Sequence, residues 1–243
     1  MYAMFPRSEK VLIAHYNESS MITGKNGSVR AFIFDLDGTL LDTKLDLVNS
    51  VNAMLRETGR PEQPTELVAS GVGYGAPQLI ARVLGPNASE QQRSEGLAVF
   101  LKHYGKQKLN LTRPYPGVLE GLRALAGYPL AVLTNKPTKL SVEILDGLGL
   151  AHLFRAIYGG DSFEQKKPDP AGALSIVKEF ACEPPNAAMV GDSDVDIQTA
   201  RNAGMLAIAV KYGFGQHNSR LCPADLYVEA LTELAPLAGY RSL

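Results

Sequence analysis

The sequence has few cysteines, almost no net charge and no long apolar segment. Its two cysteines, Cys182 and Cys222, have a spacing that matches no metal-binding or redox motif. We therefore expect two free thiols in a reducing compartment and a cytoplasmic protein. The 24 basic and 25 acidic residues leave a net charge of −1, which gives no reason to expect nucleic acid or an anionic membrane as a partner. No apolar run approaches the roughly 20 residues that would span a bilayer.

The 243 residues suffice for one sizeable domain, or for one domain with an insertion. Hydrophobic residues make up 45% of the chain, which is typical of a globular protein with a buried core. Residues 1–28 contain no continuous apolar segment followed by a cleavage site, so we expect no signal peptide. We interpret this stretch as a non-catalytic extension and hypothesise that translation begins at Met21. An intact Met1 terminus in the native protein, found by mass spectrometry, would rule this out.

Short apolar runs alternate with helix-like patterns along most of the chain. Each run ends at polar or glycine-rich residues, as expected for buried strands. The runs cover residues 29–34, 130–133, 156–158, 187–190 and 206–210. The helical patterns between them cover residues 138–148, 170–180 and 195–203. This alternation predicts an α/β fold, with a Rossmann-like parallel sheet and helices on both of its faces.

Polar or glycine residues follow directly after four of these predicted strands. They are Asp35, Thr134, Asn135, Gly159 and Asp192. Right-handed crossovers place the carboxyl ends of parallel strands on one edge of the sheet, and ligands bind at that edge in such folds. We therefore expect these residues to gather at one site.

Residues 44–112 interrupt the alternation with a run of helical patterns. The stretch lies between the first and second predicted strands and is too long for an ordinary crossover. We interpret it as an inserted helical cap domain, which leaves residues 29–43 and 113–243 for the core domain. The glycines of residues 71–75 follow no predicted strand, so we do not interpret them as a dinucleotide-binding fingerprint.

The segment from Asp35 to Thr39 carries the strongest chemical signal. Alternate residues of an extended chain point the same way, so the carboxylates of Asp35 and Asp37 can face one point. Two carboxylates so close together repel each other unless a cation lies between them. A hard cation such as Mg²⁺ takes oxygen ligands, and Gly38 allows a sharp turn. The pattern predicts a magnesium site.

Four segments, in order, resemble the four motifs of the haloacid dehalogenase superfamily of phosphatases. They are Asp35 to Thr39, Thr134-Asn135, Lys167-Pro168 and Gly191 to Asp196. The resemblance runs from Val29 to about Tyr227 and implies a Mg²⁺-dependent phosphatase with a small phosphate ester as its substrate. Within the superfamily the sequence is most similar to the bacterial phosphoglycolate phosphatases, which implies hydrolysis of 2-phosphoglycolate to glycolate and phosphate. This narrower similarity is carried by residues 133–138, 158–161, 166–170 and 212–215.

The resemblance implies a role for each acidic motif residue. Asp35 is expected to be the nucleophile that forms a phospho-aspartate. The Asp35 side chain, the Asp37 backbone carbonyl and the Asp192 side chain are expected to hold the Mg²⁺. Asp37 would protonate the leaving alkoxide and then deprotonate the water that attacks the phospho-aspartate. The cation and fixed donors are needed because an anionic carboxylate and an anionic phosphate ester repel each other.

Three further motif residues are expected to contact the phosphoryl group. Thr134 can donate a hydroxyl hydrogen bond, Asn135 can donate an amide hydrogen bond, and Lys167 supplies a positive charge. We assign this charge to Lys167 rather than to Lys166 because Pro168 follows the motif lysine in the family.

A second group of residues is expected around this centre. Thr39 and the cap-loop residues Gly73 and Tyr74 are expected to contact the substrate. Asp196 lies near the start of the helix that follows the fourth motif. It either supports Lys167 or a metal-bound water, or it is a helix-start acid favoured by the helix dipole.

Two other cations, Arg113 and Lys136, lie near the predicted edge of the sheet. Both could assist an anionic substrate, but we interpret them as solvated charges. The four histidines show no metal-ligand spacing, and we interpret them as surface or core residues.

Three alternative functions stay open at this point. A sugar-phosphate phosphatase or phosphomutase on the same fold would keep Asp35 and Asp37, and a mutase would pass the phosphoryl group to a second hydroxyl if the cap excludes water. A haloacid dehalogenase would need neither Mg²⁺ nor a group that protonates the leaving atom. A non-catalytic binding protein could retain the same fold.

Overall fold

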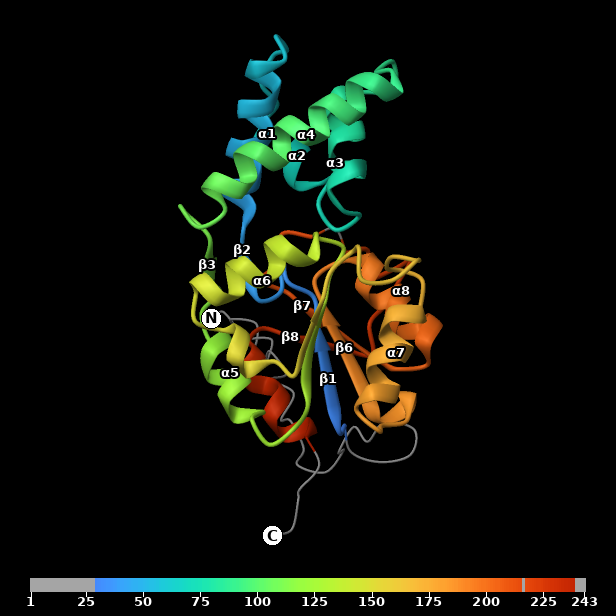
Figure 1. Ribbon diagram of the computed structural model, residues 1–243. Coiled ribbons are helices and arrows are strands. Elements are labelled where there is room, and N and C mark those ends of the chain that lie inside the picture. The colour runs from blue at the N-terminus through green and yellow to red at the C-terminus, as the bar shows by residue number, and fades with distance from the viewer. Residues whose placement is uncertain (1–28, 216, 239–243) are drawn as a thin grey trace, which may run out of the picture.

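The computed structural model describes residues 29–215 and 217–238. The expected N-terminal extension and the start at Met21 lie outside the described residues. Six parallel strands form one sheet in the order β5-β4-β1-β6-β7-β8 (Figure 1). They are β1 (Ala31–Phe34), β4 (Leu130–Leu133), β5 (Ala156–Tyr158), β6 (Ala187–Gly191), β7 (Leu206–Val210) and β8 (Leu226–Val228). The predicted parallel sheet is confirmed, and only three-residue β8 was not indicated by the sequence pattern.

Helices cover both faces of this sheet, which confirms the predicted fold class. Helices α7 (Ala171–Glu179) and α8 (Asp194–Ala203) lie on one side, and α5 (Val118–Ala124) and α6 (Thr138–Gly147) lie on the other (Figure 1). Short 3₁₀ helices cover Ala151–Leu153, Pro184–Asn186 and Leu231–Leu237. Alternate residues of β1 enter two separate cores: Phe32 and Phe34 join the core under α5 and α6, whereas Ala31 and Ile33 join the core under α7 and α8.

Four further helices lie together beyond the carboxyl edge of the sheet (Figure 1). They are α1 (Lys44–Glu57), α2 (Thr65–Ala69), α3 (Ala76–Leu84) and α4 (Glu90–Gln107). The chain enters and leaves this helical group through β2 (Leu41–Asp42) and β3 (Arg113–Pro114), which pair in antiparallel fashion. The division of the chain into a core and a cap of residues 44–112 stays a prediction. Over residues 29–215 and 217–238, no helix has the length and apolar character needed to cross a membrane.

Asp46 joins the two chain segments that connect the helical group to the sheet. Its buried carboxylate, in the first turn of α1, accepts hydrogen bonds from the backbone N–H groups of Leu111 and Thr112. The Thr112 hydroxyl donates a further hydrogen bond to Asp46 Oδ2 at 2.8 Å. The carboxylate of Asp46 therefore links the segment that enters the helical group to the segment that leaves it.

Replacing Asp46 with alanine is expected to lower the free energy of unfolding by about 2–4 kcal/mol, because three donors then lose their buried acceptor. Urea denaturation would measure the change. Asp42→Ala is the matched control, because Asp42 is an exposed carboxylate nearby that accepts a hydrogen bond from the Lys44 N–H. A loss for Asp46→Ala no larger than the loss for the control would contradict this prediction.

Candidate active site

Asp35 and Asp192 meet where strands β1 and β6 end. The backbone N–H of Asp35 donates to the carbonyl of Val190 at 2.9 Å. The chain then turns at Gly38, whose φ of 85° is a conformation that favours glycine. A Cβ atom at position 38 would lie 1.9 Å from Asp192 Oδ2. Gly38 is therefore required both for its conformation and for its close approach to Asp192, and the buried Thr39 beside it donates to Asp192 Oδ1 at 3.5 Å.

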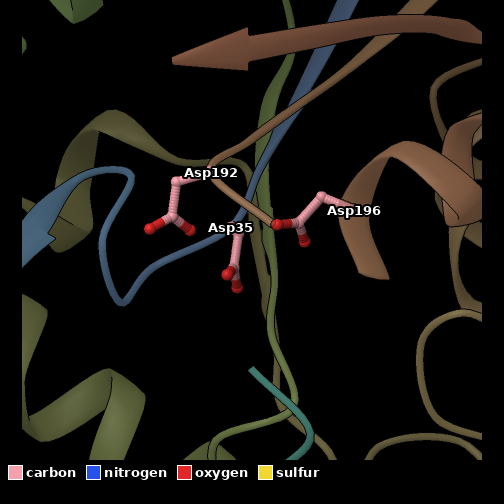
Figure 2. Close-up of side chains that lie close together, drawn as sticks. All are labelled: Asp35, Asp192 and Asp196. Carbon is pink, nitrogen blue, oxygen red and sulfur yellow. The ribbon is translucent and has the colours of Figure 1, made fainter. Parts of the chain in front are cut away.

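Asp35, Asp192 and Asp196 bring three buried carboxylates together, as Figure 2 shows. One carboxylate oxygen of each lies within 4.8 Å of the others. Burial, reinforced by the charge of Asp196 and opposed by Lys167, raises the pKa of Asp35 to about 6. Burial and the charges of Asp196 and Asp35 also raise the pKa of Asp192. Asp35 Oδ1 accepts no hydrogen bond from the described part of the chain, so this crowded oxygen cluster fits a divalent cation.

Lys167 lies between two of these carboxylates. Its Nζ is 2.9 Å from Asp35 Oδ1 and 2.6 Å from Asp196 Oδ1, and the first contact is an ion pair without the alignment of a hydrogen bond. Burial lowers the pKa of Lys167, but Asp196 and Asp35 more than offset this, so the pKa is raised. Asp196 Oδ2 also accepts from the Ser193 N–H and hydroxyl at the start of α8. Asp196 therefore both contacts Lys167 and binds the start of α8, which are the two roles that the sequence left open.

Asn135 fixes the backbone of Lys167. Its Oδ1 accepts from the Lys167 N–H at 3.0 Å, and its Nδ2 donates to the carbonyls of Lys167 at 3.0 Å and Gly73 at 2.9 Å. Both N–H groups of the amide are engaged, so this arrangement leaves none for the hydrogen bond expected from Asn135 to a phosphoryl group. The neighbouring Thr134 is buried, and its Oγ1 accepts from the Lys136 N–H at 3.3 Å.

Asp37 is held by Lys136 and Thr43. Lys136 Nζ lies 2.7 Å from both carboxylate oxygens, and the Thr43 hydroxyl donates to Oδ1 at 2.7 Å. Lys136 is only 6% exposed, so the prediction that it is a solvated charge is wrong. Burial lowers the pKa of Lys136, but Asp37 and Tyr104 more than offset this and raise it. Arg113, the other cation near the edge, is exposed and donates to backbone carbonyls.

The side chain of Asp37 is not one of the three clustered carboxylates. The sequence placed Asp37 among the cation ligands through its backbone carbonyl, and that contact stays a prediction. The cluster instead includes Asp196, for which the sequence left open a supporting role and a role as a helix-start acid.

The loop between α2 and α3 brings Gly73, but not Tyr74, to the site. The Gly73 carbonyl accepts from Asn135, and Gly73 lines the cavity described below. Tyr74 is 51% exposed and does not line that cavity. Gly73 and Gly75, on either side of Tyr74, have positive φ angles of 108° and 90°, a conformation that favours glycine. The expected contact between Tyr74 and the substrate stays a prediction.

A family model for haloacid dehalogenase-like hydrolases matches residues 32–210. The chain belongs to this family. A phosphoglycolate phosphatase of Pseudomonas syringae pv. syringae (strain B728a) is 38% identical over 216 residues, which cover 85% of this chain and 79% of that protein. A phosphoglycolate phosphatase of Neisseria meningitidis serogroup A is 41% identical over 193 residues, which cover 77% of this chain and 82% of that protein. A solved structure of a predicted phosphoglycolate phosphatase from Haemophilus somnus 129pt has a TM-score of 0.80 and 33% identity, covering 85% of this chain and 96% of that chain.

In this haloacid dehalogenase-like hydrolase, a cavity that opens to solvent lies between the sheet edge and the helical group. Its polar side is formed by Asp35, Asp37, Thr134, Asn135 and Lys136. Its apolar side includes Leu47, Val72, Ala76, Leu79, Phe100 and Leu101, which come from α1, α3, α4 and the loop before α3. A substrate could thus place its reacting group on the carboxylates and the rest of the molecule under the helices.

Three glycines whose packing role the sequence did not indicate enclose two of the carboxylates. The Gly215 N–H donates to Asp192 Oδ2 at 2.6 Å, and a Cβ at position 213 would lie 2.3 Å from Asp192 Cβ. A Cβ at position 191 would lie 2.2 Å from Asp196 Cβ. The available signal was the position of each glycine at or just beyond the end of a predicted strand, where close backbone approach is common.

Proposed function

We propose that the protein is a Mg²⁺-dependent phosphomonoester hydrolase that converts 2-phosphoglycolate to glycolate and phosphate through a phospho-aspartate on Asp35. The observation that carries this proposal is the convergence of Asp35, Asp192 and Lys167 at the carboxyl edge of the sheet, with Asp37 on the same cavity as Asp35. The names of the relatives support the choice of substrate. The free thiols of Cys182 and Cys222 support a cytoplasmic location.

Two carboxylates would divide the chemical work. Asp35 would attack the phosphorus atom, so that a P–O bond to its carboxylate forms while the P–O bond to the ester oxygen breaks. Asp37 would give a proton to the departing oxygen. Asp37 would then take a proton from the water that attacks the phospho-aspartate, which releases phosphate and restores Asp35. Lys167 and the Thr134 hydroxyl would stabilise the charge on the phosphoryl oxygens.

The Asp35 and Asp192 side chains and the Asp37 carbonyl would hold the Mg²⁺. The cation supplies positive charge that offsets the repulsion between the carboxylate nucleophile and the phosphate ester. Asp196 is the third carboxylate of the cluster, but Lys167 and Ser193 already engage its oxygens. We therefore assign Asp196 to the support of Lys167 rather than to the cation.

Phosphate release from a panel of small esters, including 2-phosphoglycolate and sugar phosphates, tests the proposal. We expect the highest kcat/KM for 2-phosphoglycolate. A chelator should reduce its hydrolysis by at least about 100-fold, and added Mg²⁺ should restore it. Activity that survives the chelator would contradict the metal requirement. Formation of a phosphate isomer without phosphate release would indicate a mutase, and no phosphate from any ester would refute the hydrolase function.

A further inference from the structure

Lys136 and Tyr104 approach each other across the cavity from different parts of the fold. Lys136 follows β4 in the loop that also carries Thr134 and Asn135, whereas Tyr104 belongs to α4 of the helical group. Lys136 Nζ lies 4.7 Å from the centre of the Tyr104 ring, and both residues line the cavity. A cation and a phenol hydroxyl thus occupy one corner of the pocket.

The hydroxyl of Tyr104 is buried and has no acceptor for its proton among the described residues. Tyr104 is 1% exposed, and its Oη makes no aligned hydrogen bond within residues 29–215 and 217–238. Lys136 interacts with this hydroxyl but can only donate, so the Tyr104 proton has no acceptor among these residues. Buried hydroxyl groups are nearly always paired, so an unpaired one that lines a pocket indicates a ligand atom as its missing acceptor. Burial raises the pKa of Tyr104, so the hydroxyl keeps its proton and can donate.

Lys136 is the one cation among the described residues that line this cavity. Lys167 serves Asp35 and Asp196 instead. The side of the cavity that faces Lys136 is apolar and comes from the helical group, and an anion buried beside it needs a paired charge. An anionic group on the substrate, other than its phosphate, therefore has Lys136 as its partner in this pocket.

We propose that Lys136 and Tyr104 bind the carboxylate of the leaving group and thereby select phosphate esters whose alcohol carries an adjacent carboxylate. This inference rests on the proposed function. Asp37 is expected to protonate the ester oxygen, and in 2-phosphoglycolate the carboxylate carbon is two bonds from that oxygen. Lys136 Nζ, 2.7 Å from the Asp37 oxygens, lies within reach of a group at that position. In the structure Lys136 Nζ donates to Asp37. With substrate bound, Lys136 would divide its N–H donors between Asp37 and the substrate carboxylate.

One partner comes from the sheet edge and the other from α4, so the carboxylate is held only when the helical group covers the site. A neutral alcohol offers Lys136 no opposite charge and gives Tyr104 a weaker acceptor. We therefore expect kcat/KM to be higher for an ester whose alcohol carries the carboxylate than for an ester of a neutral alcohol. The fold of the protein should not differ between the two.

Two variants, Lys136→Met and Tyr104→Phe, test this inference with a matched pair of substrates. The pair is 2-phosphoglycolate and its amide, phosphoglycolamide, which has nearly the same shape without the negative charge. For Lys136→Met, we expect kcat/KM to fall about 10- to 100-fold more for the carboxylate than for the amide. For Tyr104→Phe, we expect an excess loss of about 10-fold. Lys139→Met, at an exposed lysine on α6, is the control and should leave both values unchanged.

Equal losses for the two substrates in both variants would overturn the inference, because Lys136 would then act only by positioning Asp37. Tyr104→Phe removes a single oxygen atom and keeps the ring, so it tests the inference even if Lys136→Met does not fold. Wild type that hydrolyses both esters but prefers the amide would refute the carboxylate site and leave the phosphatase function standing. Wild type that releases phosphate from no ester would refute the proposed function and this inference together.

Discussion

Replacing Asp35 with asparagine is expected to reduce phosphate release by at least about 10⁴-fold, because the variant lacks the carboxylate that would form the phospho-aspartate. Asparagine has nearly the same shape, and the Asp35 backbone keeps its hydrogen bond to Val190. The loss should therefore appear in kcat with the fold retained. Steady-state assays with a detection limit below one turnover per hour, together with circular dichroism, would measure both. Substantial steady-state turnover by the folded variant would contradict the assignment of the nucleophile.

The stability of the metal-free protein gives an independent check on Asp35. Its pKa is raised from 3.8 to about 6, mainly by burial, so the folded protein binds this proton more tightly than the unfolded chain does. The contribution of Asp35 to stability is therefore favourable when it is protonated, and it is lost as the pH rises from about 4 through about 6. Asparagine carries no such charge. With chelator present, Asp35→Asn should gain in free energy of unfolding relative to wild type between pH 5 and pH 7.5, and a gap that does not change with pH would contradict this.

The positions of Asp35, Thr134 and Asp192 could be predicted because they depend on topology alone. Each residue directly follows a strand of a parallel sheet, and the carboxyl ends of such strands share one edge. The alternation of apolar runs and helical patterns was long enough to identify the sheet and its covering helices. Strand β8, with three residues, offered too short a pattern to be distinguished from a loop.

The surroundings of Lys136, Tyr74 and Tyr104 could not be predicted, because each depends on how the helical group sits over the sheet. Lys136 follows Asn135 in a polar segment. Nothing in the local sequence indicates that Lys136 is buried and paired with Asp37, 99 residues away. Tyr74 is 51% exposed, although its neighbour Gly73 accepts a hydrogen bond from Asn135, 62 residues away. Such long-range pairings leave no periodic trace in a single sequence.

Replacing Lys167 with methionine is expected to damage both activity and stability. The side chain of Lys167 is 2% exposed and offsets the charges of Asp35 and Asp196. Without it, three buried carboxylates lose their internal cation, and the free energy of unfolding of the metal-free protein should fall by about 3–5 kcal/mol. Phosphate release should fall by about 10³-fold, because a charge that stabilises the phosphoryl oxygens is lost. Mg²⁺ should recover part of the stability, since a cation that binds the folded state stabilises it, but should not recover the rate.

Lys166→Met is the matched control, since it removes the same charge from the neighbouring position. Lys166 is exposed, whereas Lys167 turns inward because Asn135 binds its backbone N–H and carbonyl. Lys166→Met should therefore change the free energy of unfolding by no more than about 0.5 kcal/mol and should keep most of the activity. Denaturation with and without Mg²⁺, and phosphate release at saturating Mg²⁺, would compare the two variants. The assignment of the charge to Lys167 fails if Lys166→Met is the inactive variant of the pair.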